Sequence, residues 1–229
     1  MIIKGFQKLT LLDFPEKTAC TVFTAGCNLR CPFCHNAALV TKIDDTIIDE
    51  EEFFSWLATR KGKLDGVAIT GGEPLMQKDI DKFIQKVVDL GFLVKLDTNG
   101  FFPDKLAELL ASGNISYVAM DIKNSLEKYA KTVETDNLDL EAVKKSVNII
   151  MNSGVDYEFR TTVTHELFDE ASFDGIASLI SGAKKYFIQS FKDSGNLIKQ
   201  GSTPEEKFVL IKYRDKMRKF VDLCEIRGI

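Results

Sequence analysis

Short apolar segments alternate with longer helical patterns along this chain of 229 residues, and no other feature constrains its fold as strongly. Six segments rich in β-branched or aromatic residues predict strands. They are Thr18–Thr24, Gly66–Thr70, Leu93–Asp97, Ser116–Asp121, Tyr157–Val163 and Lys185–Ser190. Most of them are followed by Gly, Asn or Asp, as strand ends often are.

Between these strands, apolar residues recur at spacings of three and four, which predicts amphipathic helices. The helices cover Glu50–Thr59, Lys78–Leu90, Asp104–Ser112, Asp139–Asn152, Glu170–Ile180 and Pro204–Val221. Asp49 and Thr203 precede two of them as candidate N-caps, and Pro204 suits a first helical position. Gly91 and Gly113 suit helix exits. Successive strand–helix units imply a parallel sheet, and the pattern alone allows either a doubly wound sheet or a partial barrel.

Length and composition favour one compact, water-soluble unit. We expect residues 1–229 to form a single domain. The 45% apolar and 28% charged residues exclude wholesale disorder, and the net charge of −4 argues against a general nucleic-acid binder. No run of about 18 apolar residues predicts a membrane span, and the first residues lack the pattern of a signal peptide. The expectation is a cytoplasmic protein with neither nucleic acid nor membrane as a partner.

Three of the five cysteines lie within eight positions, directly after the first predicted strand. Cys27, Cys31 and Cys34 have the spacing C-x3-C-x2-C, whereas Cys20 and Cys224 stand apart and are interpreted as inert apolar thiols. The carboxyl end of a parallel strand is where α/β folds place their chemistry. Because three adjacent thiolates repel one another unless a metal neutralises them, the group predicts a metal site.

Three kinds of metal site compete for these residues. Zinc held by the three cysteines and His35 requires contorted geometry, because Cys34 and His35 are adjacent. A c-type haem fits Cys31-x-x-Cys34-His35, but it leaves Cys27 unexplained and normally belongs to an exported protein. A [4Fe–4S] cluster held by three cysteines leaves one iron open to a further ligand, which makes it a chemical site.

With Phe33 before the last cysteine, the spacing resembles the C-x3-C-x-aromatic-C signature of the radical S-adenosylmethionine (SAM) enzymes. The resemblance implies a [4Fe–4S] cluster on Cys27, Cys31 and Cys34, whose open iron is chelated by the amino and carboxylate groups of SAM. One electron then cleaves the sulfonium and yields methionine and a 5′-deoxyadenosyl radical. It also implies that Phe33 and His35 belong to the cofactor-binding residues.

The second predicted strand runs into Gly71-Gly72-Glu73-Pro74, which resembles the GGE motif that binds the SAM amino group. Two glycines allow a close backbone approach, and Glu73 is a natural acceptor for an ammonium group. Pro74 suits the start of a helix. Taken alone, the segment is more typical of an ordinary strand-to-helix turn; it is the cysteine group before it that favours the SAM motif.

The third and fourth predicted strands end in Asp-Thr-Asn-Gly and Asp-Ile-Lys, which resemble segments of glycyl-radical-enzyme activases. Without the resemblance, the first segment is a turn signal and the second an ordinary ion pair on one strand face. In the activases, the matching two Asp and the Thr hold SAM and a nearby monovalent cation, and oxygen ligands suit a hard cation. The resemblance implies that Asp97, Thr98, Asn99, Asp121 and Lys123 belong to the SAM-binding residues. It also implies a candidate cation site at Asp97, Thr98 and Asp121.

Arg160, in the fifth predicted strand, suits a fork-shaped pair of hydrogen bonds to the SAM carboxylate or adenosine. Glu158 lies on the same strand face and is an equally good partner for it. Gln189 and Phe191 are candidates to border the adenine. His165 is interpreted as a surface or structural histidine rather than an acid or base.

Longer segments resemble one branch, the anaerobic ribonucleoside-triphosphate reductase activating proteins, at residues 5–15, 96–100, 119–123, 157–162 and 225–229. This implies a partial (β/α)6 TIM-like barrel as a single radical SAM core domain, which abstracts a hydrogen atom from a glycine Cα. The implied partners are a loop of a glycyl radical enzyme, with anaerobic ribonucleotide reductase foremost, and flavodoxin or ferredoxin as electron donor. Two alternatives stay open: a radical SAM enzyme with a small-molecule substrate, and a non-catalytic zinc-binding module.

Overall fold

The computed structural model describes residues 1–41 and 47–229. Its strands form one sheet in the same order as in the sequence. They are β1 (Ile3–Thr10), β2 (Ala19–Thr24), β3 (Gly66–Gly71), β4 (Leu93–Thr98), β5 (Tyr117–Asp121), β6 (Asp156–Val163), β7 (Lys185–Ser190) and β8 (Leu223–Arg227). β1 pairs antiparallel with β2, and every later neighbouring pair is parallel.

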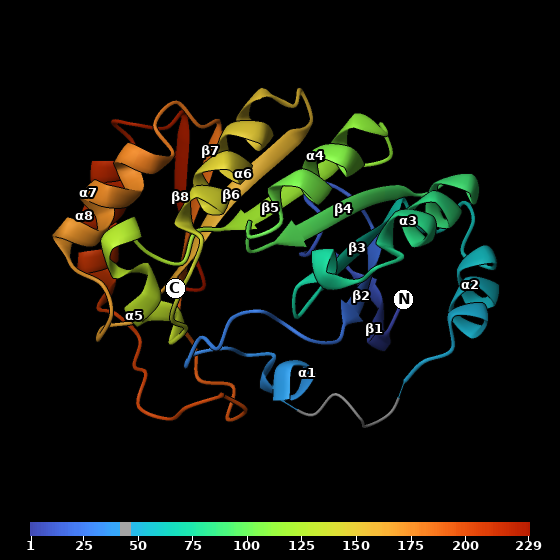
Figure 1. Ribbon diagram of the computed structural model, residues 1–229, viewed down its shortest axis with the longest axis horizontal. Coiled ribbons are helices and arrows are strands. Elements are labelled where there is room, and N and C mark those ends of the chain that lie inside the picture. Colours follow the sequence, from blue (N-terminus) through green and yellow to red (C-terminus); the bar gives the residue numbers. More distant parts are fainter. Residues whose placement is uncertain (42–46) are drawn as a thin grey trace.

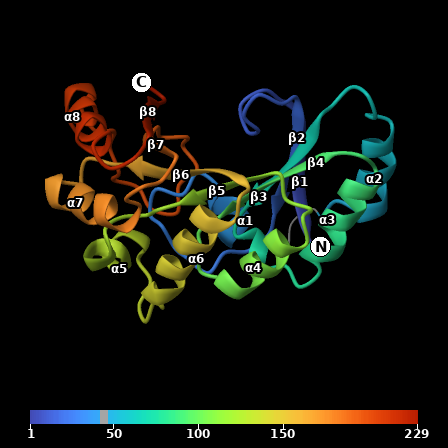
Figure 2. The same cartoon turned by 90° about the horizontal axis from the view of Figure 1, so that it is seen from above.

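Helices α3, α4 and α6 lie along one side of the sheet, whereas α1 lies with the cysteine-bearing segment near the carboxyl ends of the strands (Figure 1). From above, the outer helices form an arc with α2 and α3 at one end and α7 and α8 at the other (Figure 2). The bounds are α1 (Ala37–Thr41), α2 (Glu50–Ala58), α3 (Ile80–Asp89), α4 (Pro103–Ala111), α5 (Tyr129–Val133), α6 (Leu140–Asn152), α7 (Glu170–Leu179) and α8 (Lys207–Met217). Two single 3-10 turns are η1 (Pro74–Met76) and η2 (Leu126–Lys128). No helix in the described part of the chain has the length and apolar character needed to cross a membrane.

Burial on both faces explains why the parallel strands are continuous apolar runs. On β3, Val67 and Ile69 face the helices, whereas Ala68 faces the barrel interior, on the same side as the cavity-lining Thr70; the first three are fully buried. On α3, Ile80, Phe83 and Val87 recur at helical spacing and are buried against the sheet. The core therefore lies between the convex side of the sheet and the helices, and the concave side remains for polar side chains.

The α/β fold and the partial TIM-like barrel are confirmed, and the six predicted strands correspond to β2 through β7. Two edge strands are additional. β1 is buried only at its two end residues, Ile3 and Thr10, and has partly or fully exposed residues between them. β8 is short and mixes polar with apolar residues, so neither strand has the apolar run that identified the central strands. Edge strands expose one side to solvent, which weakens their sequence signal.

Helix boundaries follow the sequence except at α8. Asp49 caps α2 by accepting hydrogen bonds from two backbone N–H groups, as predicted. The prediction that Thr203 caps a helix starting at Pro204 is wrong, because α8 begins at Lys207. Pro204 instead forms an antiparallel bridge with Thr164, and the Thr203 N–H donates to the Glu166 carboxylate at 3.0 Å.

Candidate active site

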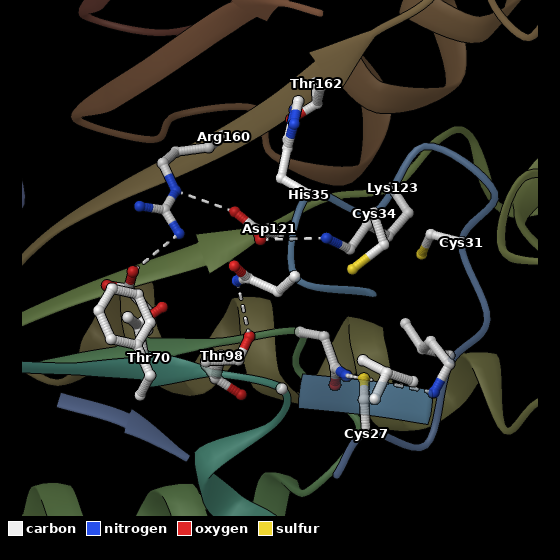
Figure 3. Close-up of a pocket in the computed structure, with 18 of the residues that line it drawn as sticks. Cys27, Cys31, Cys34, His35, Thr70, Thr98, Asp121, Lys123, Arg160 and Thr162 are labelled. Carbon is white, nitrogen blue, oxygen red and sulfur yellow. Dashed lines mark hydrogen bonds and ion pairs between the residues drawn. The ribbon is translucent and has the colours of Figure 1, made fainter. Parts of the chain in front are cut away.

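A cavity of about 460 Å³ lies at the carboxyl ends of the parallel strands. Side chains from several strands and from the loop after β2 point into it (Figure 3). The predicted site residues that line it are Cys27, Cys31, Phe33, Cys34, His35, Gly71, Gly72, Asp97, Thr98, Asn99, Asp121, Lys123 and Arg160. Glu73 and Pro74 are buried outside the lining. The sequence motifs thus meet at one place in the fold.

The loop that carries the three cysteines is held by backbone contacts with distant parts of the chain. The Arg30 N–H donates to the Val133 carbonyl at 3.1 Å, at the end of α5. The Lys199 N–H donates to the Pro32 carbonyl at 3.0 Å, from the segment that follows β7. The loop conformation therefore depends on elements more than a hundred residues away, and not on its own sequence alone.

Burial disfavours ionisation of all three cysteines in the absence of a metal. It raises the pKa of Cys27 and Cys34, and it raises the pKa of Cys31 to about 12, although Lys123 opposes this last shift. The Leu29 N–H donates to Cys27 Sγ at 3.4 Å. Thiolates in such a site require nearby positive charge, which a bound metal group supplies.

The three sulfur atoms border a common space rather than a single point (Figure 3). Within residues 1–41 and 47–229, no group of three or more His, Cys, Asp or Glu side chains is close enough to hold one metal ion. His35, the fourth ligand of the zinc alternative, stacks on Phe191 with ring centroids 5.5 Å apart. Three thiols around a larger space match the donor set of a [4Fe–4S] cluster with one open iron.

The glycine turn after β3 packs directly on the cysteine loop. A Cβ at Gly72 would lie 1.8 Å from the Gly26 carbonyl oxygen, so only glycine fits there. Gly71 adopts φ 120°, which disfavours other residues. The Glu73 N–H donates to the same Gly26 carbonyl at 2.8 Å. The glycine turn therefore holds the start of the cysteine loop in place through direct backbone contacts.

Glu73 lies behind this turn and not on the cavity surface. Its Oε2 accepts from the Asn99 N–H at 2.7 Å, and its Oε1 accepts from Thr98 Oγ1 at 2.8 Å. Oε1 also accepts from the Leu75 N–H at 3.1 Å. Burial raises the pKa of Glu73 to about 7 despite these hydrogen bonds. The carboxyl group fixes the ends of β3 and β4 relative to each other, and the glycine backbone is what faces the cavity.

A ladder of alternating charges lines the opposite wall. Arg160 donates from Nε to Asp121 Oδ1 at 2.9 Å and from a terminal nitrogen to Asp97 Oδ2 at 3.2 Å (Figure 3). Lys123 donates to Asp121 Oδ2 at 3.0 Å, and Lys95 donates to Asp97 Oδ1. Neighbouring strands bring these side chains together, because β5 pairs with β6 in a register that places Asp121 opposite Arg160.

The ladder keeps both aspartates ionised. Burial opposes ionisation of Asp97, but Arg160 and Lys95 outweigh it and lower its pKa. Burial likewise opposes ionisation of Asp121, but Arg160 and Lys123 outweigh it and lower its pKa. Lys123, Arg160, Asp97 and Asp121 of this group line the cavity, whereas Lys95 is buried behind Asp97. The mixed charges on the wall suit a zwitterionic ligand.

The sequence offered SAM or Glu158 as the partner of Arg160. The structure does not pair it with Glu158; its guanidinium instead contacts Asp97 and Asp121, a pairing that the sequence did not predict. Glu158 accepts two hydrogen bonds from Arg227, at 2.7 and 2.8 Å, and one from Tyr117 Oη at 3.1 Å. These contacts lie deeper in the barrel, one inward-facing position before Arg160 on β6.

The sequence missed the contribution of the β1–β2 hairpin. Gln7, Asp13 and Thr21 line the cavity, and the Thr21 hydroxyl donates to the Asp13 carboxylate. The available signal was the strand period, since Thr21 and Phe23 alternate with buried residues that face the helices.

The remaining candidates divide clearly. Gln189 lines the cavity, whereas Phe191 is buried against His35 and does not. His165 is a surface residue with Nδ1 3.2 Å from Glu205 Oε1. Cys20 and Cys224 are buried free thiols whose pKa is raised by burial to about 12, as expected for inert residues.

Comparison with known proteins places this geometry in a family. The model of the radical SAM superfamily matches residues 21–177. A Methanocaldococcus jannaschii protein, MJ1227, is 32% identical over 198 residues, which cover 83% of this chain and 80% of that protein. Its name assigns it, provisionally, as a glycyl-radical enzyme activating enzyme. The GTP 3′,8-cyclase of Helicobacter pylori (strain 26695) is 29% identical over 197 residues, covering 82% of this chain and 57% of the cyclase.

Among solved structures, Streptococcus suis SuiB bound to S-adenosylmethionine has a TM-score of 0.69 and 16% identity, over 90% of this chain. The chain spans about half the length of SuiB, at 49%, and little more than half of the cyclase. The likeness to SuiB is one of fold. Given the family match over more than half of its length, the chain belongs to the radical SAM superfamily, and its cofactors are a [4Fe–4S] cluster and S-adenosylmethionine.

Proposed function

We propose that this radical SAM enzyme removes a hydrogen atom from a glycine Cα of a glycyl radical enzyme, with anaerobic ribonucleoside-triphosphate reductase as the partner. The observation that carries the proposal is the extent of the likeness to MJ1227, which covers 83% of this chain and 80% of that protein. By contrast, 57% of the H. pylori GTP cyclase is covered, so that enzyme has further length without a counterpart here.

In this proposal, Cys27, Cys31 and Cys34 hold the cluster. When bound, the cluster and SAM supply one electron and a carbon radical that accepts a hydrogen atom from the substrate. Lys123 and Arg160 offer positive charge to the SAM carboxylate, and both already lie in the cavity. The backbone of the glycine turn allows the close approach that the amino group requires. The described residues thus position a small zwitterion beside the thiols and leave the chemistry to the cofactors.

An open side of the barrel supports a protein segment as the substrate. The sheet order ends at β1 and β8, and among the described residues these two edges do not pair with each other. A loop of a partner protein can therefore approach the cavity laterally. A solved structure of similar fold, SuiB bound to precursor peptide SuiA, has a TM-score of 0.68 over 91% of this chain.

A small-molecule substrate is the second candidate, and the likeness to GTP 3′,8-cyclase favours it. The match to that relative covers 82% of this chain. The two candidates differ in what must stimulate cofactor turnover: a protein with a target glycine, or a nucleotide such as GTP.

The test uses the anaerobically reconstituted protein with SAM, dithionite and the reductase of the same organism. We expect an electron paramagnetic resonance doublet from a glycyl radical, which collapses when the reductase contains α-deuterated glycine. One 5′-deoxyadenosine should form per radical, with the removed hydrogen in its methyl group. The Cys31→Ala variant should give neither signal nor deoxyadenosine. Deoxyadenosine formation that GTP stimulates and the reductase does not would overturn the proposal in favour of the nucleotide.

A further inference from the structure

The two aspartates in the candidate cation site already have cationic partners on all four carboxylate oxygens. Asp97 accepts from Lys95 on Oδ1 and from Arg160 on Oδ2, and Asp121 accepts from Arg160 on Oδ1 and from Lys123 on Oδ2. The third candidate ligand, the Thr98 hydroxyl, donates to Glu73 and accepts from the Gly100 N–H at 3.1 Å. These residues therefore do not fit an additional cation.

Lys95 is the unexpected member of this set. It lies on β4 two residues before Asp97, so both side chains face the barrel interior. The residue is 1% exposed, although lysine in a strand is usually at the surface. A buried ammonium group is costly unless an anion neutralises it, and Asp97 is the acid that it contacts. The Lys95 ammonium group thus supplies, as part of the chain, the positive charge beside Asp97 that a bound monovalent cation would otherwise supply.

Charge balance leads to the same result. Lys95, Lys123 and Arg160 against Asp97 and Asp121 leave one net positive charge in this group of side chains. Because Lys95 neutralises Asp97 from behind the cavity surface, Lys123 and Arg160, which line the cavity, can offer positive charge to a ligand carboxylate. A monovalent metal ion beside the guanidinium of Arg160 would add like charge at short range, which is unfavourable in a buried site.

We propose that Lys95, together with Arg160, replaces a monovalent cation in this chain, so that SAM binds without Na⁺ or K⁺. Lys95 is a positioning residue in this arrangement. It contacts Asp97 and holds the carboxylate that orients Arg160 toward the ligand. The proposal concerns cofactor binding and is independent of which substrate the enzyme acts on.

The test measures SAM binding to the anaerobically reconstituted protein by equilibrium dialysis. Solutions of KCl, NaCl and tetramethylammonium chloride are compared at equal ionic strength, because the methyl groups of tetramethylammonium prevent the direct coordination by carboxylate oxygens that an alkali cation makes. The wild-type dissociation constant should agree within about twofold among the three salts. A value at least tenfold weaker in tetramethylammonium would overturn the proposal, and this result needs no variant.

In the Lys95→Ala variant, we expect SAM binding to become dependent on an alkali cation. Removal of the ammonium group frees Asp97 Oδ1 and opens a space beside it. We expect SAM binding to weaken about tenfold in tetramethylammonium, as for the loss of a charge-assisted contact, and to recover in KCl or NaCl. The matched control is Lys86→Ala, whose side chain is 57% exposed and pairs with Glu50. It should show no salt-specific change.

Weak binding by Lys95→Ala that no alkali cation restores would contradict the proposed role of Lys95. The thermal unfolding midpoint of the variant without cofactors provides a second measurement: it should rise in KCl relative to tetramethylammonium chloride, whereas that of the wild type should not. Both measurements are independent of hydrogen abstraction. A failure here would therefore leave the proposed partner untouched, and a failure to activate the reductase would leave the role of Lys95 untouched.

Discussion

Two walls of the same cavity hold carboxyl groups in opposite ways. On the glycine-turn wall, Glu73 is buried among neutral backbone and hydroxyl donors, and burial raises its pKa to about 7. On the charged wall, Asp97 and Asp121 are partly buried, and although burial opposes their ionisation, cationic side chains lower their pKa. Burial alone therefore does not decide the charge of an acid in this site; the identity of the hydrogen-bond donors does.

The two walls have different roles, one in backbone geometry and the other in ligand binding. The glycine-turn wall fixes backbone geometry between the cysteine loop and the ends of β3 and β4, and its carboxyl group does not line the cavity. The charged wall presents fixed charge to whatever the cavity binds. Changes in the first wall should alter assembly and stability, whereas changes in the second should alter ligand binding together with stability.

The largest effect is expected from Gly72→Ala. The new Cβ would lie 1.8 Å from the oxygen and 2.5 Å from the carbon of the Gly26 carbonyl, so the cysteine loop must move. We expect the iron content after anaerobic reconstitution to fall to background. Gly5→Ala is the matched control, because its Cβ meets no atom within 4 Å. Equal iron content in the two variants would show that the turn does not position the cysteines.

The next effect is expected from Arg160→Lys on the charged wall. One ammonium group cannot contact Asp97 and Asp121 as the guanidinium does, so one partly buried carboxylate loses a partner. Because these side chains are between 14% and 31% exposed, the free energy of unfolding at pH 7 should fall by about 2 kcal/mol, between the scales for surface and buried ion pairs. Urea denaturation measures it. Arg214→Lys, at the surface pair with Asp215, should cost less than about 0.5 kcal/mol; similar losses would contradict the contrast between the walls.

The pH dependence of stability should distinguish the walls by sign. Because the pKa of Glu73 rises from 4.5 to about 7 on folding, its favourable contribution is complete below pH 4.5 and is lost as the pH rises to about 7. The lowered pKa of Asp97 and Asp121 acts oppositely, and their contribution is lost only as the pH falls below 3.8.

Between pH 5 and pH 7.5, the cofactor-free wild type should therefore lose about 2 kcal/mol of unfolding free energy relative to Glu73→Gln. Urea titrations at the two pH values measure this difference. The exposed Glu108→Gln provides the control and should run parallel to the wild type. Parallel curves for Glu73→Gln as well would mean that Glu73 titrates normally.

The smallest effect is expected from Thr98→Val, which links the two walls. The hydroxyl donates to Glu73 Oε1 at 2.8 Å and accepts from the Gly100 N–H, and valine has nearly the same shape. The unfolding free energy should fall by about 1 kcal/mol, and the pH midpoint of the Glu73 contribution should shift upward. Thr59→Val, at an exposed hydroxyl that donates to Trp56, should leave that midpoint unchanged. A shift of the same size in both variants would rule out the link.

Local signals account for what the sequence predicted about the fold. The central strands are continuous apolar runs because both of their faces are covered, and this pattern is visible without knowledge of the neighbours. β1 and β8 have no such run: β1 is placed by its antiparallel pairing with the next strand, β2, and β8 by its pairing with β7 across α8. The start of α8 was missed because Pro204 pairs with Thr164, a contact that helix propensity does not contain.

Within the site, the sequence predicted which residues gather at the cavity but not the directions and partners of their side chains. Motifs at strand ends must gather at one edge of a parallel sheet, so the cysteines and the charged wall meet in the cavity as expected. The direction of Glu73 depends on donors from β4 that the sequence does not place beside it. The choice of Arg160 between Glu158 and the aspartates depends on strand register. Lys95 resembles an ordinary exposed strand lysine until the closed interior is known.

The backbone contacts of the cysteine loop have a consequence for the order of events during synthesis. The loop is translated within the first 34 residues, yet Arg30 binds Val133 and Pro32 binds Lys199. His35 stacks on Phe191. A ribosome must therefore reach Lys199 before all three contacts can form. Until then, the segment that carries Cys27, Cys31 and Cys34 lacks the partners that hold it in the folded chain.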